Sequence, residues 1–329
     1  MSNIPDQIIG HEKVQAQLLA DIAHRNISHA YLFIGPPHLG KSTVARWFAW
    51  RILADGTSPE ELKAIKDSVE RLIHPDLLSL DALWIKDVQE DFKVIGQSSN
   101  LTQQHRVKAS QPPKTDTIGI DDVRSLQSRL FETGSSTRLC CLIRSIERMQ
   151  VPAATAFLKI LEEPPPRVVF ILTAESEHAL LPTIVSRTRV VRFHPLSQSA
   201  MRPLMKEEAR DDEAFALHLA KGAPGAFMRL LGDPDLLREK RQLHSQAKQF
   251  WQARMLLEHL SFLIPFADLK QDIDALLLHL GLALREYPED VLRQEMTDAY
   301  IQLLSGLKTN AHRGLLLERF ALAVHSLRC

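Results

Sequence analysis

The stretch HAYLFIGPPHLGKSTVARWFAWRIL, residues 29–53, decides the fold. Its apolar run from Tyr31 to Ile34 is typical of a central strand in a parallel sheet. The segment that follows, Gly35 to Ser42, matches the phosphate-loop pattern G-x-x-x-x-G-K-[ST]. Apolar residues at helical spacing come next, so the order is strand, loop, helix. This order predicts a phosphate site at a helix N-terminus, where backbone N–H groups and the helix dipole favour anions.

The loop supplies the candidate nucleotide-binding residues. Lys41 is expected to reach the β and γ phosphates, and Ser42 to ligate any Mg²⁺ that accompanies them. ATP or ADP is therefore the expected cofactor. Two alternatives stay open, namely a chance glycine-rich turn and a loop that has outlived its ligand. The expected phosphate-binding residues are Gly35, Pro36, Pro37, Gly40, Lys41, Ser42 and Thr43.

Strand and helix patterns alternate on both sides of this loop. Further strands are predicted within residues 74–85, 138–143, 167–174 and 188–195, and helices within 10–26, 57–73, 120–132 and 151–166, the last stopped by its three prolines. We expect Ser58 to cap the second of these helices in a capping box with Glu61, and Asp121 to cap the third. Alternation of this kind predicts an α/β fold with a parallel sheet covered by helices on both faces.

After Pro195 only helical patterns remain, which predicts three domains. These are a P-loop domain over residues 1–195, a small helical domain over 196–233 and an all-α domain over 234–329. Residues 86–117 are polar and lack a clear period, so we expect a long exposed loop or hairpin there.

Composition narrows the class of protein. Lys plus Arg equals Asp plus Glu at 40 each, which argues against a chain that coats nucleic acid alone. Cys140 and Cys141 are adjacent on a predicted strand, so they should face opposite sides of the sheet, and no disulfide framework is suggested. The sequence predicts neither a secretory leader nor a membrane span, and no C-x-x-C pair indicates zinc. A cytoplasmic protein is expected.

Several motifs occur in an order that resembles a known family. They are IIGHEKV, HAYLFIGPPHLGKST, HPDLLSL, IDDVRSLQSRL, ATAFLKILEEPPPRVVFILTAE and LLPTIVSRTRVVRFHPLS. Together they resemble delta-prime subunits of the bacterial DNA polymerase III clamp loader, which are AAA+ proteins, with gamma/tau subunits as close relatives. The resemblance covers residues 8 to about 232, with gaps at 51–73 and 86–117.

The resemblance carries further expectations. It implies an AAA+ P-loop domain, a helical lid and a C-terminal collar through which subunits assemble. The implied partners are gamma/tau-type and delta-type subunits, and, through the assembly, the sliding clamp and primed DNA. Many relatives carry four zinc-binding cysteines where this chain has residues 51–73 without any, so no zinc is expected.

The chain departs from hydrolysing relatives at two places. Arg144 and Ser145 stand where those relatives have paired acids that serve Mg²⁺ and the attacking water, so Mg²⁺ binding is disfavoured and ATP hydrolysis by this chain is not expected. Gly225 stands where a lid arginine would reach the γ-phosphate. The alternative is that Glu147 replaces the acids by a shift in register.

One catalytic element of the family is retained. Arg187 in VSRT matches the arginine that these subunits present to a neighbour's ATP, although Thr188 stands where the family has Cys. The alternative is a surface arginine among others, with Arg189 and Arg192 equally placed. Thr173 stands where relatives sense the γ-phosphate, although Thr is also common in strands.

Three functions follow from these patterns. The first is a delta-prime-type clamp-loader subunit, part of DNA polymerase III, which lends Arg187 to a neighbour. The second is an active gamma/tau-type ATPase, which the intact GKST favours and which Arg144, Ser145 and Gly225 oppose. The third is a nucleic-acid-binding AAA+ protein that acts alone. Under the first function, Arg46, Arg51, Arg106 and Lys108 are candidate contacts to template DNA within the assembly.

Overall fold

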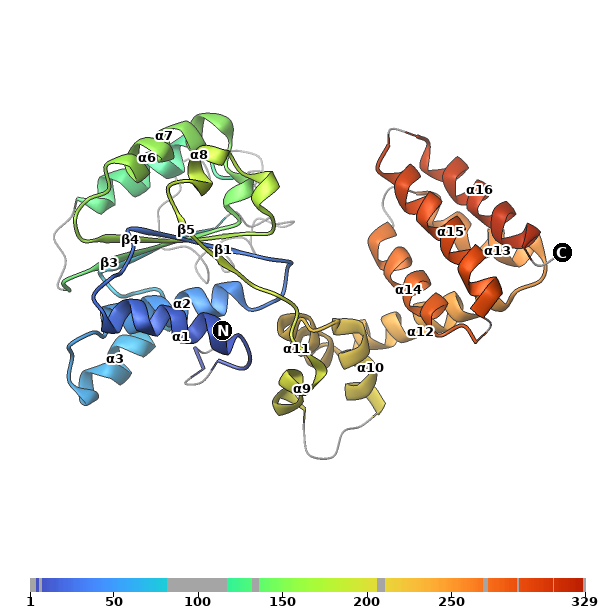
Figure 1. Cartoon of the computed structure of the whole chain (residues 1–329), viewed down its shortest axis with the longest axis horizontal. Coiled ribbons are helices and arrows are strands. Elements are labelled where there is room, and N and C mark those ends of the chain that lie inside the picture. The colour runs from blue at the N-terminus through green and yellow to red at the C-terminus, as the bar shows by residue number, and fades with distance from the viewer. Residues whose placement is uncertain are drawn as a thin grey trace. The chain divides into compact units, whose positions relative to one another are not determined.

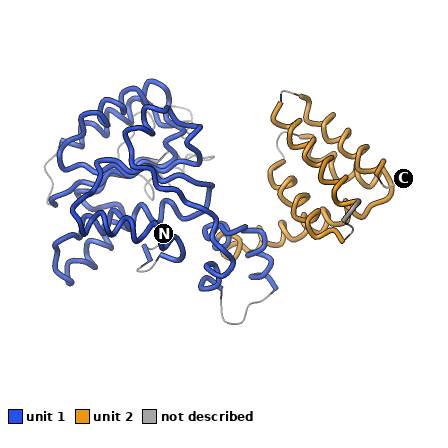
Figure 2. The backbone as a smooth tube through the Cα atoms, viewed as in Figure 1, with its two compact units in different colours: residues 1–228 blue, residues 229–329 orange. Residues whose placement is uncertain are grey.

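The computed structural model divides the chain into two compact units, residues 1–228 and 229–329 (Figure 2). It describes residues 4–5, 8–81, 117–131, 136–205, 211–268, 272–288, 290–309 and 311–327. Most of the loop expected at 86–117, including Arg106 and Lys108, lies outside the described residues, as does Cys329. Residues 196–228 belong to the first unit, and the division into three domains stays a prediction.

The first unit is built on a five-stranded parallel sheet with the order β2-β3-β4-β1-β5. All five strands were predicted from the sequence, and their positions are confirmed. The strands are β1 (Ala30–Ile34), β2 (Leu77–Asp81), β3 (Leu139–Arg144), β4 (Val168–Ala174) and β5 (Arg189–Arg192).

Helices cover both faces of the sheet (Figure 1). One face carries α1 (Glu12–Ala23), α2 (Lys41–Leu53) and α3 (Pro59–Glu70), and the other carries α6 (Ile120–Leu130), α7 (Val151–Glu162) and the short α8 (Pro182–Val185). This is the α/β architecture that the sequence predicted, a parallel sheet with helices on both faces.

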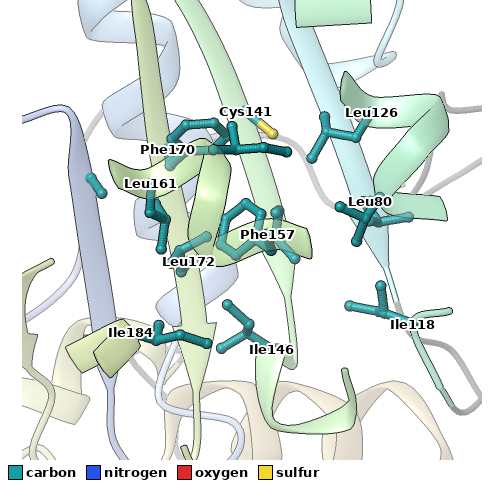
Figure 3. Close-up of a cluster of buried hydrophobic side chains, with 14 of the residues drawn as sticks. Leu80, Ile118, Leu126, Cys141, Ile146, Phe157, Leu161, Phe170, Leu172 and Ile184 are labelled. Carbon is teal, nitrogen blue, oxygen red and sulfur yellow. The ribbon is translucent and has the colours of Figure 1, made fainter. Parts of the chain in front are cut away.

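Buried side chains form a separate core on each face. Figure 3 shows Phe157, Phe170 and Leu172 among the side chains packed between the sheet and α6, α7 and α8. The core on the opposite face includes Tyr31, Phe48 and Val69. The neighbouring thiols of Cys140 and Cys141 belong one to each core, as strand alternation predicted. Burial raises the pKa of both thiols, because the charged form is poorly solvated there.

The helix starts test the capping predictions. The Ser58 hydroxyl accepts the N–H of Glu61, and the Glu61 carboxylate accepts the N–H of Ser58, so the predicted capping box is confirmed. The prediction that Asp121 caps α6 is wrong, since the N-cap is Gly119. The helix begins two residues earlier than a cap at Asp121 would place it, and Asp122 accepts the Gly119 N–H at 2.8 Å.

Helices alone make up the described chain after β5. Short elements α9 (Gln198–Met201) and η3 (Arg202–Leu204) lead to α10 (Asp211–Ala220) and α11 (Pro224–Gly232). The second unit contains α12 (Pro234–Gln252), α13 (Leu256–Leu263), η4 (Ile264–Ala267), α14 (Ile273–Arg285), α15 (Asp290–Leu307) and α16 (Arg313–Ser326). Its core is centred on Phe250, Trp251 and Phe320. The helical C-terminal region expected from the sequence is therefore confirmed.

Candidate nucleotide site and surface arginines

The phosphate loop joins β1 to α2, as predicted. Gly35 follows the strand, and a Cβ at this position would lie 2.4 Å from the Phe193 carbonyl oxygen, so only glycine fits there. Gly40 has a φ of 87° and is the N-cap of α2, whose first residues are Lys41, Ser42 and Thr43. The expected phosphate-binding residues therefore surround a helix N-terminus, which is an arrangement that suits an anion.

The Lys41 ammonium turns back onto its own loop. It donates to the Gly35 and Pro36 carbonyl oxygens, the second at 2.7 Å. Burial lowers the pKa of Lys41. The negative charges of Glu175 and Glu147 raise this pKa, and the positive charge of Arg144 lowers it further. The two carboxylates have the larger influence among these charges, so the local field of the three residues favours a cation at Lys41.

Sequence reasoning missed Glu175. It directly follows β4, and β4 pairs with β1 through Phe33–Thr173 and Ile34–Ala174. Carboxyl ends of neighbouring parallel strands meet at one edge of a sheet, so a residue just after β4 belongs beside the phosphate loop. That topological rule could have identified Glu175, had the strand order been known.

Arg144 and Ser145, which stand where hydrolysing relatives are expected to have acids, lie at the same edge of the sheet as the phosphate loop. Arg144 is the last residue of β3, and Ser145 follows it with a left-handed φ of 53°. The Ser145 N–H donates to the Thr173 hydroxyl oxygen at 3.2 Å. Thr173 is buried, and its hydroxyl is thus engaged with the backbone at the replaced position. Its role as a γ-phosphate sensor stays a prediction.

Glu147 lies in η1 (Ile146–Arg148), two residues beyond Ser145. Its carboxyl group is half-buried, and burial raises its pKa, with a further contribution from Glu175 and an opposing one from Lys41. Among the described residues, its Oε2 atom is buried without a hydrogen-bond partner. The alternative that Glu147 replaces the missing acidic pair is therefore supported by the electrostatic interaction of its carboxylate with Lys41.

Gly225 contacts the phosphate loop directly. Its N–H donates to the His38 carbonyl oxygen at 2.9 Å, and His38 itself has a left-handed φ of 62°. A Cβ at residue 225 would lie 2.9 Å from the same oxygen, closer than side chains normally approach. At residue 225, where the resemblance leads us to expect a lid arginine, the backbone thus lies in close contact with the backbone of His38.

The three arginines of the SRTRVVR segment have different surroundings. Arg187 follows α8 and pairs with Glu162 at 2.9 Å, and its side chain is 36% exposed. Arg189 pairs at 2.8 Å with Asp21, whose side chain is only 7% exposed. Arg192 pairs with the carboxylate of Glu177. The alternative of three equally placed surface arginines does not describe these surroundings, because among the three only Arg189 has a buried partner.

Three further expectations concern contact with DNA, zinc and membrane spans. Arg51 lies against the Trp50 ring at 5.5 Å, and DNA contact by Arg46 or Arg51 stays a prediction. Residues 51–73, where the resemblance led us to expect no zinc, contain the end of α2 and all of α3. Within the described ranges, no helix has the length and apolar character needed to cross a membrane.

A family model and several curated relatives are DNA polymerase III subunits. Residues 10–197 match the family model described as DNA polymerase III, delta subunit. The chain is 24% identical over 233 residues to DNA polymerase III subunit tau of Bacillus subtilis, which covers 68% of this chain and 36% of that protein. It is 30% identical over 216 residues to the delta' subunit of Pseudomonas aeruginosa, which covers 62% of this chain and 56% of that subunit.

A solved structure is also similar. It is a gamma-subunit-related protein of DNA polymerase III from Thermotoga maritima, with a TM-score of 0.46 and 20% identity over 95% of this chain and all of the other. Relative to the curated proteins above, the matched part of this chain spans between about a third and just over half of their length.

Proposed function

Because the chain belongs to the delta-prime family of DNA polymerase III clamp-loader subunits, we propose that it serves a clamp-loading assembly by lending an arginine to a neighbour's ATP. Its partners are gamma/tau-type and delta-type subunits, and the assembly loads a sliding clamp onto primed DNA. The subunit itself binds ATP or ADP at residues 35–43 and hydrolyses it little or not at all.

The observation that carries this proposal is the position of Arg187. Its side chain is 36% exposed and the residue follows the short helix α8, so a neighbouring protein can approach it. An arginine donated across an interface stabilises the charge that develops on the transferred phosphoryl group. In its own site, by contrast, Arg144 and Ser145 stand at the end of β3, where a hydrolysing subunit needs carboxylates.

Reconstitution tests the proposal as a whole. Gamma/tau-type and delta-type subunits, sliding clamp, primed DNA and ATP are mixed with and without this chain, and clamps on DNA are counted. We expect loading to require the chain, and size-exclusion chromatography to show it in the same complex as the other subunits. Loading at the same rate without the chain would contradict the proposed function.

The isolated chain is expected to turn over ATP negligibly, with or without Mg²⁺ and DNA. The reason is the position of Arg144 and Ser145 rather than net charge, since Glu147 and Glu175 outweigh Arg144 at Lys41. Steady-state phosphate release, with Lys41→Ala as the background control, measures this. A Lys41-dependent rate on the order of 1 s⁻¹, the low end of ordinary enzyme rates, would contradict it.

A gamma/tau-type ATPase is the second candidate function, and Glu147 is the observation that favours it. Its carboxylate influences Lys41 and has a buried oxygen close to the loop. If the isolated chain hydrolyses ATP and Glu147→Gln abolishes the activity, this carboxylate replaces the acidic pair. In that case the second candidate is correct for this chain's own site.

A further inference from the structure

Three acceptors of the same chain hold the Arg187 guanidinium. Its Nη2 atom lies 2.9 Å from Oε1 of Glu162. Its Nη1 atom donates to the Thr183 carbonyl oxygen at 3.1 Å and to the Ser186 hydroxyl at 3.4 Å. Thr183 and Ser186 are local to α8, whereas Glu162 comes from the end of another helix, α7. Glu162 is thus the contact that ties the arginine to the rest of the unit.

The position of Glu162 is unfavourable for a carboxylate without a cation beside it. It is the last residue of α7, and the C-terminal end of a helix carries a partial negative charge. Arg187 supplies the compensating cation. The adjacent Glu163 caps the same helix end, and it gives a second carboxylate of the same kind for comparison.

The contacts leave capacity for an external ligand. A guanidinium has five N–H donors in a fixed plane, and the three contacts use three of them. The carboxylate of Glu162 is half-exposed, so the ion pair orders the arginine at the surface without withdrawing it from solvent. Ordering a long side chain before docking removes the need to order it on binding.

We infer that Glu162 is a positioning residue for Arg187: its carboxylate holds the guanidinium in the orientation from which the remaining donors meet a nucleotide phosphate of the neighbouring subunit. The inference rests on the proposed function, because it concerns the arginine that the chain lends. It adds a residue from the LEEPPP segment, at the end of α7, to the apparatus that serves the neighbour.

The experiment uses the reconstituted assembly with ATP, clamp and primed DNA, and measures kcat and KM for ATP at the neighbour's site by single-turnover hydrolysis. Glu162→Ala is expected to lower kcat on the order of tenfold. This is the lower range for the loss of a residue that orients another functional side chain by a hydrogen bond. Glu162→Gln keeps an acceptor oxygen and should fall between the wild type and Glu162→Ala. KM should change less than about twofold, since positioning acts in the transition state. Glu163→Ala is the matched control and should turn over ATP like the wild type.

A double mutant separates positioning from general damage. In the Arg187→Ala background, Glu162→Ala should have no further effect, because the residue acts only through the arginine. Equal losses in both backgrounds would overturn the inference, as would a rise in kcat, which would mean that the ion pair withholds the arginine. A loss with Arg187→Ala but none with Glu162→Ala overturns the inference alone. Wild-type turnover by Arg187→Ala overturns the proposed function, and the inference with it.

Discussion

Replacing Arg187 with alanine is expected to lower ATP turnover at the neighbour's site by ~10³-fold, the lower range for an arginine that stabilises phosphoryl transfer from across an interface. The isolated variant should fold like the wild type, because the ion pair with Glu162 is partly exposed and such pairs contribute about 0–1 kcal/mol. Single-turnover hydrolysis in the reconstituted assembly is the measurement that resolves one site. In steady state a loader with several such arginines would lose less.

Arg192→Ala is the matched control for this experiment. It removes the same charge from the same segment, and its partner Glu177 is a partly exposed carboxylate like Glu162. We expect assembly and turnover to match the wild type. If Arg187→Ala and Arg192→Ala lowered ATP turnover equally, the loss of one positive charge would explain the effect. Arg187 would then have no catalytic role.

Arg189→Ala is expected to have the largest effect on stability. The variant leaves the buried Asp21 carboxylate without its cation, and the residue that remains beside it is Tyr31, whose hydroxyl donates to Asp21 at 3.0 Å. Burial raises the pKa of Tyr31 to about 12, so this neighbour stays neutral at ordinary pH and supplies no charge. Removing one partner of a fully buried pair costs about 3–5 kcal/mol.

The expected loss here is about 2–3 kcal/mol in the free energy of unfolding of the first unit, because the guanidinium is 35% exposed and water screens part of the interaction. Hydrogen exchange of the α1 and β1 amides reports on that unit, since a chain of two units need not unfold in one step. Asp21→Asn combined with Arg189→Ala should lose less than the sum of the single variants, because no charge is left buried. A loss below about 0.5 kcal/mol, the range of neutral surface changes, would contradict the prediction.

The stability loss expected for Arg189→Ala also decides which variant can serve as a control for Arg187→Ala. The sequence places Arg187, Arg189 and Arg192 within six residues, and only the family resemblance singles out Arg187. An Arg189 variant that loads clamps poorly would therefore report damage to the fold. Only Arg192 is suited to test whether charge loss alone affects turnover.

The fold was more predictable than the site for a physical reason. The strand, loop and helix at residues 29–53 follow from local patterns of side chains and from glycine conformation, and such patterns are visible in the sequence. The alternation that sends Cys140 and Cys141 into different cores is equally local. The one error in capping, at Asp121, shifts the start of α6 by two residues.

Contacts between distant segments were not predictable in this way. Glu175 influences Lys41 because β4 lies beside β1, and Arg189 meets Asp21 because β5 lies on the other side of β1. Neither strand order nor side-chain partners can be derived from a single sequence. The same holds for Glu162, which was visible only as one acid of the LEEPPP segment until the structure paired it with Arg187.

The backbone contact between Gly225 and His38 has an evolutionary consequence. A single codon change could bring an arginine to residue 225, yet its Cβ would meet the His38 carbonyl oxygen at 2.9 Å, so the loop or the helix would have to move as well. At Ser145 an introduced acid would also have to accept a left-handed backbone, which Asp tolerates better than Glu. Under the proposed function, a gain of ATP hydrolysis by this chain would therefore need coordinated changes at residue 225, in the loop that it contacts, and at Ser145.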